Sequence, residues 1–337
     1  MRLLCFSLIV TTCSFSAVAQ QCENLIFEGG GVRGIAYVGA LQVLDEEKIL
    51  SAVQRVGGTS AGAIAALTVS LGYKPAEIEK IIYDTRIEKF NDGRYFFVGG
   101  LSRLSKKYGW YRGDAFSKWL GRLIEVKTGN ESITFKELHD QGFKDLYVTG
   151  TSLNNQKLIV FSYVNYPDMK VKDAVRISMS IPLYYEAVCI DSIGHVQDIR
   201  KAKGKYDIMV DGGFTGNFPI FVFDSLKMVN DAIIRVPNAS TIGLRIDTEA
   251  QIEYDTEQKG IAPMNVERFK DYMGAFYNYV IENLNRSSLQ DSDWKRTVSI
   301  SSGGVGPKVR KLPLADKNLL INNGRVAMRA FLVSSLK

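Results

Sequence analysis

Two short apolar runs near the start of the chain are each followed by a glycine-rich turn and a helical pattern. The run 25–27 predicts a buried strand, which ends in three consecutive glycines at 29–31. Apolar residues then recur at helical spacing over 35–44. A second run, 53–56, leads into the turn 58–62 and another apolar helical pattern. The first 72 residues therefore predict two strand–turn–helix units in succession.

The rest of the chain continues this mixture of strand and helix patterns, without an internal repeat or a low-complexity segment. Strands are expected where short apolar runs are bounded by turn residues, and helices where apolar residues recur every three or four positions. The expected strands are 146–153, 158–161, 206–210, 242–246 and 297–300, and a polar surface hairpin is expected over 189–205. The expected helices are 75–83, 114–127, a short one from 134, 172–180, 268–289 and 317–336.

The helix expected over 268–289 carries an apolar stripe. Such a stripe is more typical of core packing than of a face that contacts a membrane, so we expect it to be buried. The stripe comprises Phe269, Tyr272, Met273, Phe276, Val280 and Leu284.

The stretch 86–112 is rich in aromatic and basic residues and has only weak periodicity. One interpretation is a mobile cap that contacts lipid headgroups, because such side chains favour the membrane interface. The other is a small subdomain whose rings pack over the sheet. If the stretch contacts lipid, the residues expected at the surface are Phe96, Phe97, Trp110 and Tyr111, beside Arg94, Lys106 and Lys107.

The amino terminus has the pattern of a secretory signal. Arg2 precedes an apolar run to Val10, and Ala17-Val18-Ala19 supplies small residues before a cleavage site after Ala19. A membrane anchor fits less well, because serines and threonines interrupt the run. We therefore expect residues 1–19 to be removed and the protein to be exported, either secreted or periplasmic, and to work at a membrane surface.

The composition narrows the possible classes further. The 337 residues suit one large α/β domain with an insertion, or two small domains. Outside the signal only Cys22 and Cys189 remain, which either pair or are separate small buried side chains. Their spacing fits no metal site, and we expect no metal or other cofactor. The formal net charge of +6 is compatible with an anionic lipid surface, and no nucleic-acid partner is expected.

The turn 58–62 has the spacing Gly-x-Ser-x-Gly of a nucleophile elbow. Gly58 and Gly62 leave room for a sharp strand-to-helix turn and for the close approach of neighbouring strands. Ser60 then lies at a helix N-terminus, where free N–H groups favour developing negative charge. Ser60 is therefore the candidate nucleophile.

The first glycine-rich turn predicts the complementary part of a catalytic site, an oxyanion hole. Consecutive glycines at a helix N-terminus aim several backbone N–H groups at one point. We expect the N–H groups of Gly30, Gly31 and Ala61 to act as donors. Arg33 and Gly34 are expected to support the loop, Arg33 through backbone hydrogen bonds. The whole set assigned to the oxyanion hole is Gly29, Gly30, Gly31 and Ala61, with Gly29 also permitting the turn.

A serine nucleophile needs a proton acceptor, and the two histidines of the chain are poorly placed for it. No histidine follows Asp211, and a pair of Asp191 with His195 would lie on the predicted surface hairpin. Asp211 ends a buried strand, where partial desolvation would make its carboxylate a better base. Gly212 and Gly213 allow close approach of another backbone or of substrate. Asp211 is therefore the candidate general base.

Three motifs, taken together and in this order, resemble the patatin-like phospholipase family. They are the glycine run 29–34, the elbow 58–62 and the Asp-Gly-Gly at 211–213. The block 176–182 (Arg-Ile-Ser-Met-Ser-Ile-Pro) and the later Asn217-x-Pro219 are similar to further family motifs. The resemblance covers about residues 24–219.

This resemblance implies a three-layer α/β/α sandwich with a Rossmann-like, mostly parallel sheet, a nucleophile elbow and a cap-like insertion. It also implies hydrolysis of fatty-acyl esters by a Ser60–Asp211 dyad without histidine. The chain departs from the family's usual Asp or Ser before the glycine run, where it has Glu28. Residues 20–337 are expected to form the domain, although no motif is matched after about residue 220.

Two other functions fit parts of the sequence less well. The spacing Gly-x-Gly-x-x-Gly over 29–34 also suits dinucleotide binding, but no acidic residue ends the second strand. A non-catalytic lipid-surface or host-interaction protein with this fold would need neither Ser60 nor Asp211. We therefore expect a lipid acyl hydrolase of phospholipase A or lysophospholipase type. Its expected partner is membrane phospholipid or another acyl lipid, met through peripheral membrane contact.

Overall fold

The computed structural model describes residues 22–93, 96–202, 204–286 and 288–335, with the backbone alone at 96–98, 270, 273 and 277. The predicted signal sequence 1–19 lies outside the described residues, so its cleavage and export of the chain stay predictions. Arg94 and the side chains of Phe96, Phe97 and Met273 also lie outside them. Among the described helices, none is both long and apolar enough to span a bilayer.

A large mixed sheet forms the centre of the molecule. The predicted apolar runs lie within two residues of its longer strands, and its two short strands at 188–190 and 196–197 belong to the region expected as a surface hairpin. Its strands are β1 (Asn24–Phe27), β2 (Arg55–Gly58), β4 (Asp145–Ser152), β5 (Lys157–Phe161), β7 (Val188–Ile190), β8 (Val196–Gln197), β9 (Asp207–Asp211), β12 (Thr241–Asp247) and β13 (Thr297–Ser301). Two short ribbons lie beside it: β3 (Gly109–Tyr111) with β6 (Leu183–Tyr185), and β10 (Ser225–Val229) with β11 (Ala232–Val236).

The strand order, over the described residues, is β13-β12-β1-β2-β4-β9-β7-β8, with β5 also paired to β4. The strands from β13 to β4 run parallel to their neighbours. Beyond β4 the pairings are antiparallel, and β4 and β5 form the hairpin expected around Asn154. The fold is thus mixed α/β with a large, mostly parallel central sheet, as predicted.

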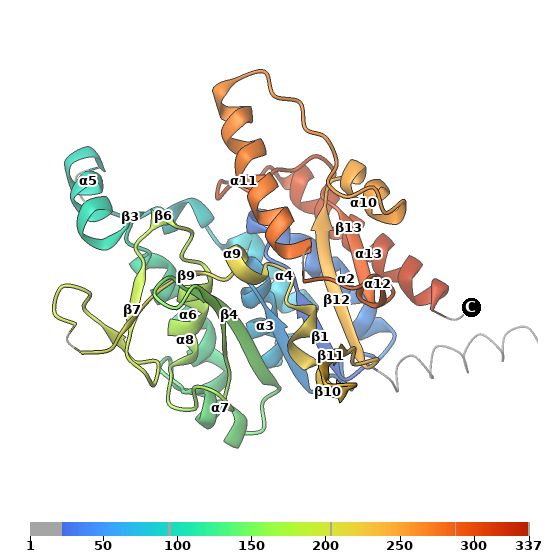
Figure 1. The fold of residues 1–337 in the computed structure, drawn as a ribbon, viewed down its shortest axis with the longest axis horizontal. Helices are drawn as coiled ribbons and strands as arrows, with labels where there is room; N and C mark the ends of the chain where they lie inside the picture. The colour runs from blue at the N-terminus through green and yellow to red at the C-terminus, as the bar shows by residue number, and fades with distance from the viewer. Residues whose placement is uncertain (1–21, 94–95, 203, 287, 336–337) are drawn as a thin grey trace, which may run out of the picture.

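Helices cover the sheet and connect its strands (Figure 1). The longer ones are α2 (Ala36–Glu46), α3 (Ala61–Ser70), α4 (Pro75–Asp84), α5 (Phe96–Lys107), α6 (Asp114–Thr128), α8 (Val171–Ser178), α10 (Glu249–Thr256), α11 (Phe269–Arg286) and α13 (Leu314–Ser334). The short ones are η1 (Gly31–Ile35), η2 (Ile87–Phe90), α7 (Phe135–Asp140), α9 (Gly213–Gly216), η3 (Ile220–Phe223) and α12 (Asp291–Trp294).

Strand β1 shows how the two faces of the sheet are covered. Side chains alternate along a strand, so Leu25 and Phe27 point to one face and Ile26 to the other. Leu25 and Phe27 belong to the main core, together with residues of α2, α3 and α13. Ile26 instead packs with Phe218 and Ile220 in a smaller core around η3. Apolar layers therefore lie on both sides of the sheet.

The prediction that α11 buries its apolar stripe is wrong. Phe269 is 80% exposed, and Tyr272 and Phe276 are both more than half exposed. Only the C-terminal part of the helix is buried, where Ile281 and Glu282 face the body of the protein. Figure 1 shows the N-terminal part of α11 projecting away from the sheet, which agrees with the exposure of its described rings.

The aromatic and basic stretch 86–112 packs as a small subdomain where the structure describes it. Trp110 and Tyr111 are half-buried in β3, and the Tyr111 ring lies 4.9 Å from that of Tyr184. Lys107 forms an ion pair with Glu186 at 2.9 Å, and Lys106 is exposed. Trp110 and Tyr111 are thus only partly exposed, and contact of this stretch with lipid stays a prediction.

Cys22 and Cys189 are free thiols, and both are buried. The Cys22 thiol contacts the carbonyl of Asn24 at 3.7 Å, and burial raises its pKa to about 12. The structure therefore agrees with the second interpretation, in which the two cysteines are separate buried side chains.

Candidate active site

Ser60 sits at the junction between β2 and α3 in a strained backbone conformation. Its φ of 53° and ψ of −122° are unusual for a residue with a side chain. The turn is possible because Gly58 and Gly62 flank it. A Cβ on Gly62 would collide with the backbone carbonyls of Phe27 and Glu28, which end the neighbouring strand. The Gly-x-Ser-x-Gly spacing thus places the serine where β1 and β2 both end.

The segment 178–180 at the end of α8 joins Ser60 to Asp211. The Ser60 N–H donates to Ser178 Oγ at 2.8 Å, and the Asp211 N–H donates to the Ser180 carbonyl at 2.9 Å. Met179, between them, places its Sδ 3.5 Å from Ser60 Oγ. The sequence showed this block only as a family-like motif, because its contacts with Ser60 and Asp211 join residues that are not neighbours in the chain.

Asp211 ends β9 and is almost completely buried, with 4% of its surface exposed. Its Oδ1 accepts a hydrogen bond from the Gly213 N–H at 2.7 Å. Burial raises the pKa of Asp211 to about 7, and hydrogen bonds from the Gly213 N–H and the Ser60 hydroxyl limit that rise. The Ser60 hydroxyl is thus within reach of the Met179 sulfur and the Asp211 carboxylate, and the carboxylate is the stronger acceptor. The structure brings Ser60 and Asp211 together.

The backbone N–H groups of Gly30, Gly31 and Ala61 donate to no acceptor among the described residues. They remain free for a ligand, as an oxyanion hole requires. Gly29 differs, because its N–H donates to the Asn217 carbonyl at 3.0 Å. The prediction that Gly29 belongs to the oxyanion hole is therefore wrong, because its N–H is not free to act as a donor there. We call residues 29–31 the oxyanion loop.

Several contacts hold the oxyanion loop in place. The Arg33 Nε donates to the Gly30 carbonyl at 3.2 Å, which is the backbone support expected of it. Gly31 has a φ of +55°, a conformation that favours glycine, and it lies against the backbone of Pro307. A Cβ on Gly34 would lie 3.0 Å from that of Ala61, so this glycine lets η1 approach the elbow.

The glycines that follow Asp211 are required by close packing. A Cβ on Gly212 would collide with the side chain of Thr149 in β4. One on Gly213 would lie 3.1 Å from Asp211 Oδ1, so it would crowd the carboxylate. Both therefore support the candidate base, as the motif predicted.

Neither histidine hydrogen-bonds Ser60. His139 stacks on Tyr163 and pairs with Asp145 at 2.7 Å, with its side chain 44% exposed. His195 is half exposed on the β7–β8 hairpin and lies 3.8 Å from Asp191. The alternative Asp191–His195 pair thus exists, but on the surface and without a bond to the candidate nucleophile.

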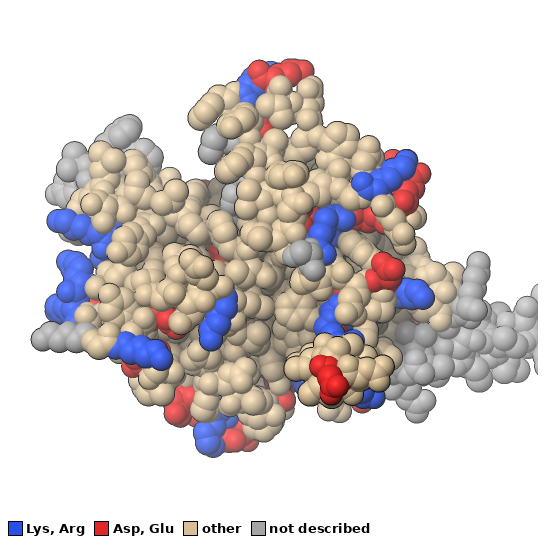
Figure 2. All heavy atoms as spheres, in the orientation of Figure 1, with Lys and Arg blue, Asp and Glu red and all other residues tan. Residues whose placement is uncertain are grey.

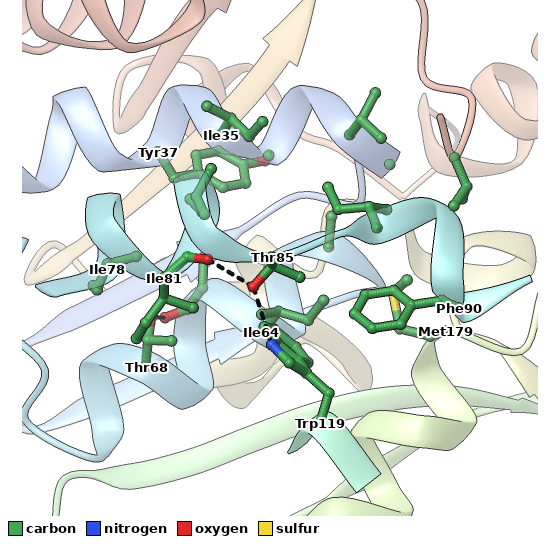
Figure 3. A pocket seen from close by; sticks show the side chains of 18 of the residues that line it. Ile35, Tyr37, Ile64, Thr68, Ile78, Ile81, Thr85, Phe90, Trp119 and Met179 are labelled. Atoms are coloured by element: carbon green, nitrogen blue, oxygen red, sulfur yellow. Dashed lines mark hydrogen bonds between the residues drawn. The ribbon is translucent and has the colours of Figure 1, made fainter. Parts of the chain in front are cut away.

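An apolar cavity of about 120 Å³ lies beside the oxyanion loop. Met179 and Ala61 line it at the candidate site, and Figure 3 shows Phe90 beside Met179 with Ile78 and Ile81 further along. Two of its polar side chains bond within the protein: the Trp119 Nε1–H donates to Thr85 Oγ1 at 3.1 Å, and Thr85 donates to the Ile81 carbonyl at 2.6 Å. The cavity therefore presents hydrocarbon to a ligand.

Residues 25–224 match the family model described as patatin-like phospholipase, which is more than half of the chain. The chain belongs to the patatin-like phospholipase family. It is 35% identical to the uncharacterized protein YqhO of Bacillus subtilis, over 59% of this chain and 65% of that protein. It is 27% identical to the probable lipid hydrolase 463L of Invertebrate iridescent virus 6, over 61% of this chain and 65% of that one. The aligned part thus spans just under two thirds of these relatives.

The solved structure of VipD from Legionella pneumophila has a similar fold, with a TM-score of 0.56. The similarity covers 93% of this chain and 67% of VipD, at 15% sequence identity. At that identity the likeness supports the mixed α/β fold alone. It extends the fold comparison beyond residue 224, where the family model ends.

In this patatin-like chain, a buried ionic cluster behind the oxyanion loop escaped the sequence analysis. Glu28 lies 3.5 Å from Arg245, which also pairs with Asp247 at 2.6 Å and with Glu282 at 2.8 Å. Burial raises the pKa of Glu28 to about 8. The only sequence signal was the glutamate itself, where the family has Asp or Ser. Among the described residues, no cluster of His, Cys, Asp and Glu is suited to bind a metal.

Proposed function

We propose that this protein hydrolyses fatty-acyl esters of lipids, with Ser60 as nucleophile and Asp211 as general base. The observation that carries the proposal is the strained, buried Ser60 joined through the segment 178–180 to the buried Asp211, whose burial raises its pKa to about 7. A base with a pKa near neutrality can take a proton from the serine and return it within one catalytic cycle. Family membership supports the same chemistry.

In the proposed reaction, Asp211 accepts the Ser60 proton as Oγ attacks the acyl carbonyl carbon. The resulting oxyanion is stabilised by the free N–H groups of Gly30, Gly31 and Ala61. When the tetrahedral intermediate collapses, the ester C–O bond breaks and the leaving alcohol takes the proton from Asp211. Asp211 then deprotonates a water that attacks the acyl-serine ester, which releases the fatty acid and regenerates Ser60.

The apolar cavity supports an acyl chain as the group held during this reaction. It begins at Ala61 and Met179, which flank the nucleophile, and its Thr85 hydroxyl and Trp119 indole N–H both already have partners within the protein. Burying an acyl chain there is favoured by about 0.8 kcal/mol for each methylene removed from water. We infer that the acyl part enters this cavity while the alcohol part of the lipid remains on the solvent side of Ser60.

Peripheral contact with a lipid surface belongs to this proposal, since a hydrolase of membrane lipids must reach its substrate. The exposed rings of α11 are better candidates for that contact than the half-buried Trp110 and Tyr111. Tyrosine favours the membrane–water interface, and phenylalanine is common on the apolar face of helices that lie in it. On the face drawn in Figure 2 the basic side chains lie in small separate groups, and we propose that the contact depends on the aromatic residues of α11 more than on charge.

The test is product analysis after incubation of the purified protein with mixed diacyl phospholipids, lysophospholipids and glycerides. Release of free fatty acid by the wild-type protein, and none by Ser60→Ala, would support the proposal and identify the substrate class. If neither protein releases fatty acid but both bind lipid vesicles, the chain would instead be a non-catalytic lipid-surface protein.

A further inference from the structure

Asn217 connects the oxyanion loop to the turn that carries the candidate base. Its Nδ2 donates to the Gly29 carbonyl at 3.0 Å and to Glu28 Oε1 at 3.3 Å, and its carbonyl accepts the Gly29 N–H at 3.0 Å. Its Oδ1 fills the space beside Gly213, where an added Cβ would lie only 3.2 Å away. One residue thus contacts both halves of the proposed catalytic machinery.

Asn217 is itself held by helix α11. Its backbone N–H donates to Oδ1 of Asn285, which is 4% exposed. The Asn285 side chain is fixed in turn, because its Nδ2 donates to the Ile281 carbonyl one turn earlier at 2.6 Å. A buried N–H that loses its acceptor costs about 1–3 kcal/mol, so the segment would move to find another partner.

A second connection runs from α11 to the residue before the oxyanion loop. Glu282 pairs with Arg245 at 2.8 Å, and Arg245 lies 3.5 Å from Glu28. Glu28 is also fixed by the Ile246 N–H, which donates to Oε2 at 3.1 Å. Successive turns of the same helix therefore reach the loop by two separate routes.

We propose that Asn285 is a positioning residue that holds the oxyanion loop in its catalytic geometry through Asn217. Helix α11 lies beyond residue 224, where the family model ends, so this assigns a catalytic purpose to a part of the chain without recognised motifs. The inference rests on the proposed function, because it concerns the geometry of that same site.

The proposal predicts a specific kinetic effect. A displaced oxyanion loop weakens binding of the transition state but not of the acyl chain, whose cavity is lined by none of the α11 side chains that the structure describes. Loss of the Asn285 contact should therefore lower kcat and leave KM nearly unchanged. Loss of a single oxyanion donor costs about 10²–10³ in rate, so a displaced loop should cost at least about tenfold.

The chain supplies a matched control two residues away. Asn283 also donates its Nδ2 to the carbonyl one turn earlier, that of Tyr279 at 2.7 Å, but it is exposed. Asn285→Leu and Asn283→Leu thus make the same substitution in the same helix, and only the first removes a contact with Asn217. Asn285→Asp keeps an oxygen acceptor at the position.

The experiment measures kcat and KM for a soluble short-chain p-nitrophenyl ester, together with inhibition by an alkyl trifluoromethyl ketone. This inhibitor forms a tetrahedral adduct whose oxyanion occupies the hole. We expect Asn285→Leu to lose at least about tenfold in kcat and a similar factor in inhibitor affinity. Asn283→Leu should match the wild type, and Asn285→Asp should recover most of the loss.

The inference is overturned if folded Asn285→Leu keeps the wild-type kcat, or if Asn283→Leu loses as much. If Asn285→Leu does not fold, Asn285→Ala is judged by the same criteria. An active wild type with an unaffected Asn285 variant would refute only the positioning role. A wild type without esterase activity, equal to Ser60→Ala, would overturn the proposed function and this inference together.

Discussion

At the scale of single residues, the candidate site combines a strained nucleophile with a base that is costly to ionise. Ser60 has a positive φ, and the folded protein must supply the energy that holds it there. Asp211 is buried and forms no ion pair with any residue that the structure describes, and its charged form accepts a hydrogen bond from the Gly213 N–H. Both features reduce the stability of the fold. Such features are common at functional sites, where they serve reactivity.

The first prediction concerns the pH dependence of activity. Asp211 must be ionised to accept the Ser60 proton, and its pKa is raised to about 7. The value of kcat/KM for a soluble ester should therefore rise with pH and reach half its maximum near pH 7. Rates for Ser60→Ala, measured alongside, remove the contribution of uncatalysed hydrolysis. A profile that is flat between pH 5 and 8 would show that Asp211 is not the base.

The second prediction concerns stability at the same residue. Because burial raises the pKa of folded Asp211, its carboxyl carries no ionisation cost at low pH, and the protein loses stability as the pH rises from the unfolded pKa value toward 7. Asp211→Asn has no such loss. The free energy of unfolding of Asp211→Asn, relative to that of the wild type, should therefore increase with pH. The increase should be about 1.4 kcal/mol for each pH unit between the unfolded and folded pKa values of Asp211. Urea denaturation at pH 4, 6 and 8 measures this, and an unchanging difference would contradict it.

At the scale of elements, the close approach of β1 to the elbow depends on a glycine in α3. A Cβ on Gly62 would overlap the carbonyls of Phe27 and Glu28. We predict that Gly62→Ala lowers the free energy of unfolding by at least about 2 kcal/mol. Gly274→Ala is the control, because that position of α11 is exposed with nothing within 4 Å, and it should gain about 0.5–1 kcal/mol. Equal effects of the two substitutions in thermal denaturation would contradict this packing.

The elements and the motif residues could be predicted from the sequence because their signals are local. Apolar runs with flanking glycines predict the positions of β1, β2 and the elbow to within a few residues of where the structure has them. The stripe of α11 was misjudged because spacing alone does not reveal whether another element covers it. The bond between Asn217 and Asn285, and the pairing of Glu28 with Arg245, join residues far apart in the chain. No local pattern distinguishes those side chains from ordinary surface polar residues.

At the scale of the whole molecule, α11 connects an exposed aromatic surface to the candidate site. Phe269, Tyr272 and Phe276 are exposed in its N-terminal part, and Asn285 is buried in its last turn. If the protein works on lipid aggregates, the same helix would both contact the lipid surface and hold the oxyanion loop.

The fourth prediction is that vesicle binding depends on α11. In the Ser60→Ala background, which leaves lipid intact, Phe269→Ala with Phe276→Ala should weaken binding to phosphatidylcholine vesicles about tenfold or more. Trp110→Ala is the comparison, because its ring is half-buried. Sedimentation with vesicles gives the affinities. If the double variant bound as tightly as its parent, or if Trp110→Ala alone abolished binding while folded, the lipid surface would lie elsewhere.

The most direct test of the central claim is the activity of Ser60 and Asp211 variants, single and combined, on one defined phospholipid. Residues that act as a unit lose activity non-additively. We predict that Ser60→Ala and Asp211→Asn each lower kcat/KM by at least about 10³, that the double variant is no worse than the poorer single one, and that His195→Ala retains wild-type activity. Substantial activity in folded Asp211→Asn, or its loss in folded His195→Ala, would contradict the Ser60–Asp211 dyad.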